Sequence, residues 1–471
     1  MAVTASSGIE IGRRALQAQQ TALQVTSHNI ANVNTPGFSR RTVDLTNVGG
    51  GSGVGLGVDI SSVLRQRNVF LDAQARVEQQ VLGRWEAMER ALTGIEGIFN
   101  EPTGAGSSEA GTIFNEPSGL GLSGSLSRFW NAWQDVANVP ESGAARAAVR
   151  QEADFLANTM HQIYGQVADS RRGLDEGIVR QAQEINDILD SLAVINREIQ
   201  RSGFDGGVGG DLADERDRLL EDLSNRVDIS VIEKDNGQIS VLLSGHNLVQ
   251  QNEATHLDVR RVTQNDFPTS IVFFSDDGSL AQIREGQLRG MMEVRDTTIP
   301  DILTRLDILA ATMVQEVNRL HRTGVGSTGA TAIDFFDNSK TSASNIILDD
   351  RILADLNNIA ASADGNPGDN AVALSIAALR NADDIADLQG NTVESFYFTL
   401  LGEVGSRSKE AQTMAENHRL FASQIDNRRQ SVQGVSLNDE ASKLVLFQRA
   451  YQAAARTVSI MDDLMEVTIN L

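Results

Sequence analysis

An apolar residue recurs at every seventh position near the beginning of the chain. These residues are Ile9, Leu16, Leu23 and Ile30. The positions three residues after them are held by Gly12, Gln19, Thr26 and Val33. This alternation is the spacing of a coiled-coil stripe, but the stripe is narrow because half of its positions are small or polar. Since isolated helices gain little stability in water, we expect a long helix that needs a partner.

The end of the chain carries a second stripe with the same three-and-four spacing. Its members are Leu444, Phe447, Tyr451, Ala454, Val458, Met461, Met465 and Thr468. Two long helices with narrow apolar stripes can bury those stripes against each other. We therefore expect the chain ends to pair as a coiled coil and to offer their remaining apolar residues to neighbouring copies. Spacing alone leaves open a second interpretation, in which two amphipathic helices dock on a globular core.

A sharp turn is predicted directly after the first stripe. Thr35 precedes a proline and is therefore disfavoured in the helical region. Pro36 and Gly37 suit the central positions of a type II turn, where glycine supplies the positive φ, and Phe38 gives the turn an apolar anchor. The stripes and the turn together define the predicted self-assembly residues: Ile9, Leu16, Leu23, Ile30, Asn32, Pro36, Gly37, Phe38, Leu444, Phe447, Tyr451, Val458, Met461 and Met465.

Between its ends, the chain alternates between helical and strand-rich segments. A helical seam is formed by Ile178, Ile185, Leu192 and Ile199, which lie seven residues apart. Alternating strand patterns separated by turn residues replace it after Val227. We predict a mainly α, elongated, multi-domain protein with inserted β structure. Its parts are a terminal helical domain (1–34 plus 436–471), a discontinuous helical body (35–227, 286–325 and 385–435), a β domain (228–285) and a small mixed insert (326–384).

Two further segments of the body break the helical pattern. Residues 49–57 read GGGSGVGLG, which matches no phosphate-binding pattern, so we interpret them as a flexible connector before a short strand at Val58–Ile60. The sequence IFNEP occurs twice, at Ile98–Pro102 and at Ile113–Pro117. Two copies are too few for a solenoid. We interpret them as one tandem duplication in a loop, with a role that the sequence leaves open.

The charge balance restricts the class of partner. The chain of 471 residues has 40 basic and 63 acidic side chains, for a net charge of −23. A nucleic-acid binder needs a basic face, and an anionic membrane repels an acidic protein, so we expect neither partner. No apolar run approaches the length of a membrane span, and the beginning of the sequence lacks the pattern of a cleaved signal peptide. Export would therefore use a route that reads an uncleaved N-terminus.

No set of residues in the sequence forms a pattern for catalysis or metal binding. There is no cysteine, and the six histidines are scattered, without a pair at metal-ligand spacing. A nucleophile elbow is also missing. A carboxylate pair placed in a cleft is not excluded by a sequence with this many acids. We expect a protein without a cofactor, a metal or an enzymatic activity.

Five segments give the sequence a resemblance to a known family. Residues Ala15–Arg40 resemble the N-terminal signature of bacterial flagellar rod, hook and hook-associated proteins, and Ser431–Leu471 resemble the C-terminal end of the same superfamily. Within that superfamily, Phe129–Ser142, Asp211–Val231 and Gly286–Gly324 resemble the hook-associated protein type 1 family. The resemblance covers most of the chain. It is weakest between about Asn338 and Asp384, and the duplicated IFNEP segment departs from it.

The resemblance implies an extracellular structural subunit of the bacterial flagellum. Such a subunit would form a homo-oligomeric ring at the hook–filament junction, between the hook protein and the next hook-associated junction protein. It would leave the cell through the flagellar type III apparatus, after a cytoplasmic export chaperone has held its C-terminal helix. Two alternatives stay open at this point: another axial protein such as the hook subunit, or a secreted enzyme or adhesin with a helical stalk and a ligand site in the β insert or in residues 330–380.

Overall fold

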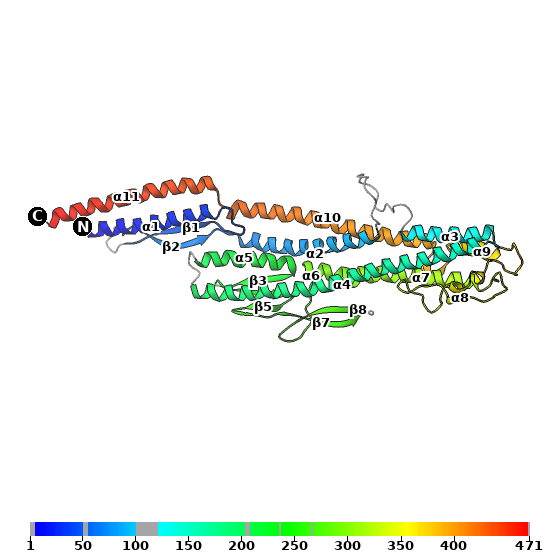
Figure 1. Cartoon of the computed structure of the whole chain (residues 1–471). Helices are drawn as coiled ribbons and strands as arrows, with labels where there is room; N and C mark the ends of the chain where they lie inside the picture. Colours follow the sequence, from blue (N-terminus) through cyan, green and yellow to red (C-terminus); the bar gives the residue numbers. More distant parts are fainter. Residues whose placement is uncertain are drawn as a thin grey trace.

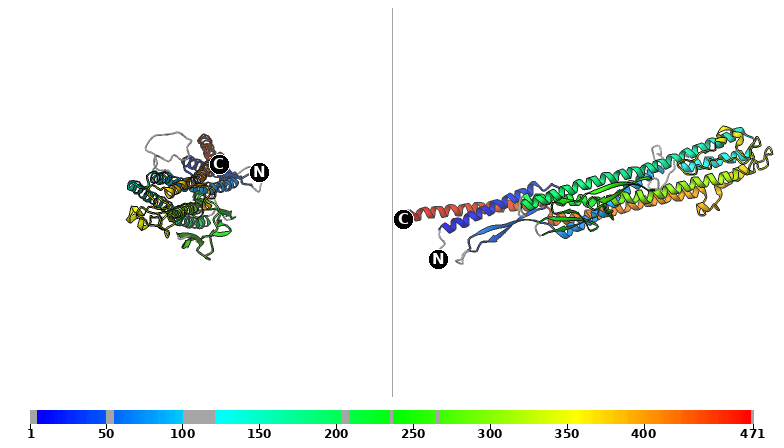
Figure 2. Two further views of the ribbon diagram at one scale, coloured as in Figure 1. Left: turned by 90° about the vertical axis from the view of Figure 1, so that its right-hand side faces the viewer. Right: turned by 90° about the horizontal axis from the view of Figure 1, so that it is seen from below.

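The computed structural model describes residues 5–49, 55–99, 121–202, 208–234, 237–264 and 267–469. The molecule is elongated, and both ends of the chain lie at the same end of it (Figure 1). Helices run along its length, and small antiparallel sheets lie beside them (Figure 2). The predicted fold class, a mainly α, elongated protein with inserted β structure and paired terminal helices, is confirmed. The second IFNEP copy and the central residues of the glycine-rich connector lie outside the described residues.

The chain runs along the long axis of the molecule several times (Figure 1). The helices are α1 (Ala5–Ala31), α2 (Val69–Phe99), α3 (Leu122–Asn138), α4 (Gly143–Ser202), α5 (Val208–Arg226), α6 (Gln287–Glu293), α7 (Ile299–His321), α8 (Asp350–Ala354), α9 (Ala371–Ala378), α10 (Val393–Gln433) and α11 (Leu437–Ile469). The strands are β1 (Arg41–Asn47), β2 (Val58–Arg65), β3 (Ile229–Glu233), β4 (Ile239–Leu243), β5 (His246–Gln250), β6 (Glu253–Ala254), β7 (Leu257–Gln264) and β8 (Phe267–Phe274).

Helix α4 is the longest element, with 60 residues, and it connects the two halves of the body. The predicted seam lies on it, and Ile178, Ile185, Leu192 and Ile199 are all buried. Beside α4, helix α10 packs along α2 as the return leg of the chain. Among the described helices, none has the length and apolarity that crossing a bilayer requires.

The inserted β structure consists of two sheets. Strands β3, β4, β5 and β6 form one antiparallel sheet in that order, and β7 and β8 form a separate two-stranded ribbon. Two asparagines of α4 hold these sheets by their backbone. Asn196 accepts from Ile239 N and donates to Ile239 O, and Asn186 does the same with Leu257. The strands are thus hydrogen-bonded to α4, which lies outside 228–285. Whether residues 228–285 form a separate domain stays a prediction.

A third sheet differs from what the sequence predicts. Only a short strand at Val58–Ile60 was expected after the glycine-rich connector, but β1 and β2 pair as a hairpin with Arg41 opposite Arg65. The Val48 amide donates to Gly57 O at 2.9 Å, and Val48 O accepts from Leu56 N at 2.8 Å, so the described residues next to the two strands continue the hairpin pairing. The first strand was missed because β1 mixes charged and apolar residues and has no turn signal of the usual short hairpin type.

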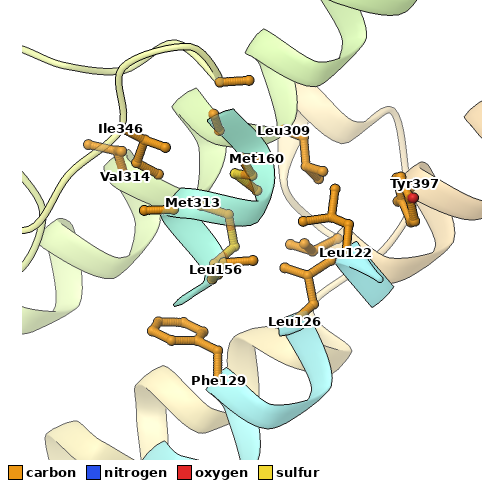
Figure 3. Packing of buried hydrophobic residues seen from close by; sticks show 14 of the residues in the cluster. Leu122, Leu126, Phe129, Leu156, Met160, Leu309, Met313, Val314, Ile346 and Tyr397 are labelled. Atoms are coloured by element: carbon orange, nitrogen blue, oxygen red, sulfur yellow. The ribbon is translucent and has the colours of Figure 1, made fainter. Parts of the chain in front are cut away.

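The main hydrophobic core lies in the half of the molecule that is remote from the chain ends. Figure 3 shows side chains from several helices converging there, among them Leu126 and Phe129 of α3, Met160 of α4, Met313 of α7 and Tyr397 of α10. Aromatic rings fill its centre, and the ring centroids of Trp133 and Phe335 are 5.2 Å apart. A second core, between α4, α5 and the sheets, continues along the body.

Candidate assembly surface at the chain ends

Helices α1 and α11 pack against each other in antiparallel orientation (Figure 1). Contacts at two levels fix their register: Gly8 lies against Met461 near the tip, and Asn29 bonds to Glu440 near the body. The pair extends beyond the compact part of the body, as the view from below shows (Figure 2). Two residues of the predicted C-terminal stripe, Val458 and Met461, therefore face the N-terminal helix.

Small residues of α1 allow the close approach of α11. A Cβ atom at Gly8 would lie 2.9 Å from the Sδ of Met461, and one at Gly12 would lie 2.4 Å from the Cγ2 of Val458. Both distances are shorter than a van der Waals contact. The flexible end of Met461 can move away from a side chain at position 8, whereas the branched Val458 makes glycine the fitting residue at position 12. Further along α1, the most buried residues continue as Ala18, Ala22, Thr26 and Asn29. The contact between the two helices thus uses Gly12 and Thr26, two small or polar positions of the predicted stripe, together with Gly8, Ala18, Ala22 and Asn29, which the stripe did not include.

The large residues of the predicted N-terminal stripe lie beside this contact. Ile9, Leu16, Leu23 and Ile30 are all half-buried. Ile9, Leu23 and Ile30 each directly follow one of the α1 residues that are buried: Gly8, Ala22 and Asn29. One residue corresponds to about 100° of rotation around a helix. The stripe therefore flanks the intramolecular contact, and a part of its apolar surface stays accessible in the single chain.

The predicted C-terminal stripe forms the inner face of α11, with one exception. Leu444, Phe447, Val458, Met461 and Met465 are half-buried. Tyr451, by contrast, is exposed at 38%.

A second apolar row on α11 escaped the sequence analysis. It consists of Leu446, Ile460, Leu464 and Val467, whose exposed fractions are all above one half. Leu446, Ile460 and Val467 are separated from one another by multiples of seven residues. Each of the four residues directly precedes a position of the predicted C-terminal stripe. The signal was present in the sequence, because Ala453 fills the remaining heptad position. We call these four residues the outer row.

The predicted turn is present at the base of the helix pair. The amide of Phe38 donates to Thr35 O at 3.2 Å, and Gly37 has a φ of 80°, as a type II turn requires. Asn32 accepts from Thr35 Oγ1 at 3.1 Å and also donates to His28 O at 3.0 Å, so it joins the helix end to the turn. Pro36 is exposed, and the ring of Phe38 lies 5.4 Å from that of His28.

A buried polar contact locks the pair just above this turn. The side chain of Asn29 donates to Arg41 O and to the Glu440 carboxylate, both at 2.9 Å, and accepts from Arg41 N at 3.0 Å. Glu440 also accepts from Arg40 Nε at 2.9 Å. Burial raises the pKa of Glu440, but the hydrogen bonds from Asn29 and Arg40 outweigh it and the pKa is lowered. A single polar pair in a helix seam fixes register. The sequence analysis missed both residues, because polar residues were read only as gaps in the stripe.

Arginine–carboxylate pairs fasten the base of the pair to the body. Arg65 at the end of β2 lies 2.5 Å from Asp214 and 2.8 Å from Asp217 of α5. Arg41 reaches Asp211 of the same helix at 2.5 Å. At the end of α10, Arg429 lies 2.5 Å from Glu221. Burial raises the pKa of the Glu221 carboxyl despite Arg429. Ion pairs therefore join the base of the helix pair to the body, whereas the two helices beyond the base are held together by apolar contacts over small residues.

A pocket of 600 Å³ opens between the turn and the α10–α11 junction. Its walls are residues 32–38, Arg40, Asp426, 429–436 and Asp439. Several of its polar groups are already engaged: Arg40 N donates to Gln433 O at 2.9 Å, and Arg429 pairs with Asp72 at 3.2 Å. The pocket is thus an elbow between the body and the chain-end pair. It contains no pairing of a nucleophile with a base among the described residues.

One group of side chains elsewhere has the composition of a metal site. His246, Asp276 and Asp277 bring three candidate ligand atoms within 4.8 Å of one another at the surface of the β insert. His246 Nε2 lies 2.9 Å from Asp276, and its ring stacks on Phe274 with the centroids 3.9 Å apart. These contacts account for the position of the histidine without an ion. The sequence analysis did not bring these residues together, because 30 residues separate His246 from Asp276.

Three family models match separate parts of the chain. The helical domain of the flagellar hook-associated protein FlgK matches residues 107–336. The flagella basal body rod protein model matches residues 9–38, which cover most of α1 and the turn. The C-terminal model of the flagellar basal body rod FlgEFG proteins matches residues 429–471, which include α11. The two rod-type models therefore coincide with the helix pair and its elbow.

Whole proteins resemble the chain over nearly its full length. The flagellar hook-associated protein 1 of Bacillus subtilis is 29% identical over 98% of this chain and 97% of its own. The protein of the same name from Escherichia coli is 22% identical over 99% of this chain and 100% of its own. Among solved structures, the flagellar hook junction protein FlgK from Burkholderia pseudomallei has a TM-score of 0.64 at 13% identity and covers 77% of this chain and 100% of its own, which supports the fold.

Proposed function

The chain belongs to the flagellar hook-associated protein 1 family, and from this premise we propose that it assembles through its terminal helices into a ring that joins hook and filament. It is a structural component of the flagellar hook–filament junction. The observation that carries the proposed mechanism is the outer row of α11, because Ile460 is exposed at 58% in the single chain although it continues a heptad pattern. An exposed apolar row on a long helix marks an interaction surface.

The partners of these surfaces are copies of the chain and the adjacent axial proteins. The pair carries two different apolar surfaces, the outer row on α11 and the half-buried residues of α1, such as Leu16 and Leu23. Contact between unlike surfaces of two copies is heterologous and generates rings or helical stacks. Each large aliphatic residue buried in such a contact contributes about 1.5–3 kcal/mol. Several neighbours are needed to offset the cost of ordering the helices, about 1–2 kcal/mol per residue.

We infer the other partners from the same surfaces. The hook protein and the next hook-associated junction protein would contact the ring on its two sides. Before export through the flagellar type III apparatus, a cytoplasmic chaperone would cover α11, because the outer row is an aggregation hazard on a free monomer. The proposal includes no catalytic role: the elbow pocket is built from a turn, helix caps and paired charges such as Arg429–Asp72. The match of the hook-associated helical domain over residues 107–336 favours this role over that of the hook subunit.

A charge placed in the outer row tests the proposal. In a strain whose own copy is deleted, a gene for Ile460→Asp should be expressed and the protein exported, but filaments should be lost from the hooks. The reason is that a carboxylate cannot be buried in an apolar contact without a partner. Motility, electron microscopy of isolated flagella and immunoblots of the medium provide the measurements.

The matched control is Ser459→Asp, which adds the same charge at the neighbouring, exposed position of α11. It should leave filaments intact. If Ile460→Asp supports filaments as well as the control does, the outer row has no part in assembly. An antibody against the chain should label the hook–filament junction, and labelling along the whole hook would favour the hook subunit.

A further inference from the structure

At the tip of the molecule opposite to the chain ends, one buried cation has no ion-pair partner among the described residues. Arg146 in the first turn of α4 is only 5% exposed. Its Nε is fully buried and has no hydrogen-bond acceptor, and no carboxylate of the described residues lies within 4.0 Å of its guanidinium. Burying a charge without compensation is costly. Burial accordingly lowers the pKa of Arg146, with no opposing contribution from a nearby acid.

The other buried arginines of the described chain each form an ion pair or a cation–π contact. Arg216 pairs with Glu233 at 3.2 Å, and Arg295 pairs with Asp175 at 2.7 Å. Arg41 pairs with Asp211. Arg171 lies over the ring of Phe267, with its Cζ 4.4 Å from the centroid. Arg146 has neither kind of contact with the described residues, so its counter-charge is not supplied by the part of the chain that the structure describes.

Arg146 lines a pocket of 320 Å³. The walls come from three segments: the turn before α4 (Pro140, Glu141 and Gly143), the loop Val325–Ser327, and the loop around residues 357–369. A pocket of this volume accommodates a small ligand or a protruding side chain. Helix α4, whose first turn contributes to the pocket, begins at the end of the molecule opposite to the helix pair (Figure 1).

The acids and hydroxyls of the walls do not neutralise Arg146. The carboxylate of Asp369 accepts from Ser362 Oγ at 2.8 Å, Ala363 N at 2.6 Å and Ala371 N at 3.1 Å. These bonds lower the pKa of Asp369 to about 2 and turn its oxygens toward its own loop. Glu141 is exposed and forms no ion pair with Arg146. Ser327 is bonded to Asn357 at 2.8 Å.

The start of α4 adds a second positive feature to the pocket. Ser142 caps the helix, since its Oγ accepts from Ala145 N at 3.2 Å. The two preceding amides, of Gly143 and Ala144, have no intrahelical acceptor, as in every helix start. No acidic residue occupies the first turn. The partial positive charge of a helix N-terminus therefore adds to that of the arginine.

From these observations we propose that the pocket at the start of α4 is an oxyanion site in which Arg146 binds a carboxylate or a phosphate. The planar guanidinium can donate two parallel hydrogen bonds to such a group. Two sources supply this chemistry: a free anion, or an acidic side chain of a second copy of the chain. The site lies away from the chain ends and is independent of the junction role proposed above.

The test measures the binding of inorganic phosphate to the full-length protein by isothermal titration calorimetry at low protein concentration. The wild type should bind phosphate at one site, and Arg146→Met should bind it about tenfold to a hundredfold more weakly, which corresponds to one or two charge-assisted hydrogen bonds. Arg150→Met is the matched control. Arg150 lies one turn further along α4 and donates to Leu353 O at 3.2 Å, so its loss should leave phosphate binding unchanged. Circular dichroism verifies that each variant is folded, and Arg146→Lys provides a variant that keeps the charge.

A second arm distinguishes the two sources. Sedimentation velocity at high protein concentration measures self-association with and without phosphate. If the carboxylate comes from a second copy, Arg146→Met should weaken self-association and phosphate should compete with it, whereas a free-anion site leaves self-association unchanged in the variant. The proposal is overturned if the wild type neither binds phosphate more tightly than Arg146→Met nor loses self-association through the substitution.

Discussion

The remote core and the chain-end pair are both helical, but they differ in how they bury their apolar residues. In the remote core, Trp133 and Phe335 are completely enclosed by side chains from several elements. In the chain-end pair, two helices meet over glycine and alanine, and their large aliphatic residues stay half-buried or exposed. Helix α10 spans the two regimes: it has buried residues up to Ala415, and then none until Gln433.

This difference indicates which contacts stabilise each region. The body buries enough apolar surface to be stable as a single chain, since a fully enclosed aromatic contributes several kcal/mol. The pair buries few large apolar side chains, which is why we propose that other molecules supply part of its stabilisation. We expect variants in the two regions to fail in different assays: core variants in unfolding of the single chain, and pair variants in assembly.

The largest effect on the single chain is expected from the core. Trp133→Ala removes a fully buried ring that packs on Phe335. The resulting cavity should lower the free energy of unfolding by about 3–5 kcal/mol. Urea denaturation followed by circular dichroism measures it. A loss below about 1 kcal/mol would mean that the core is much looser than the structure describes.

An intermediate effect is expected from the glycine contact of the pair. In Gly12→Ala, the new Cβ would lie 2.4 Å from Val458 Cγ2, so the helices have to separate. Overpacking of this kind costs about 1–3 kcal/mol. The control is Gly94→Ala in α2, where a Cβ meets no atom within 4 Å and should stabilise the helix by up to about 1 kcal/mol. Hydrogen exchange of 437–469 in the assembled junction, where we expect this helix to be protected, compares the two variants. Equal behaviour would contradict the antiparallel register.

A smaller effect is expected from pH. The pKa of Glu440 is lowered in the folded chain. Its contribution is therefore present above the pKa of the unfolded state and is lost as the pH falls through the folded value. Acidification should loosen the elbow before it affects the body. Glu440→Gln should remove this pH dependence, as followed by hydrogen exchange of α1, and an unchanged profile in the variant would show that other groups cause it.

The smallest effect on the single chain is expected from the outer row. Because Ile460 is exposed, Ile460→Asp should change the free energy of unfolding of the isolated chain by less than about 0.5 kcal/mol. Urea denaturation provides the value. A loss above about 2 kcal/mol would mean that the row is buried within the molecule, and the assembly defect of this variant would then be one of folding.

The sequence predicted the helices and their arrangement better than it predicted the contacts between them. Heptad spacing predicted both terminal helices and their pairing. The sequence Pro36-Gly37 predicted the turn after the first helix. These features could be predicted because they depend on residues close together in the sequence. The sequence predicted only some of the residues that meet: Val458, Met461 and Gly12 belong to the predicted stripes and lie in the contact, but Gly8 was not predicted. The large residues Leu16 and Leu23 flank the contact. Helix rotation is set by the closest approach of backbones, which favours small residues over large ones. The bond between Asn29 and Glu440 joins residues 411 positions apart, and no local pattern could reveal it.

The site at Arg146 could not be predicted for a similar reason. An arginine in the first turn of a helix is ordinary, and its burial depends on the loops around residues 325–327 and 357–369, which lie far away in the sequence. The β1–β2 hairpin was missed because its strands are joined by a glycine-rich segment that resembles a linker. In each case the decisive information is a long-range contact.

Hydrogen exchange of the full-length chain, dilute and assembled, tests the central claim most directly. The account predicts that residues 5–31 and 437–469 exchange rapidly in the dilute monomer while α3, α7 and the first half of α10 are protected. In the assembled junction, both terminal helices should become protected. Strong protection of both helices in the dilute monomer, at the level of α7, would contradict the claim that copies of the chain supply what the pair lacks.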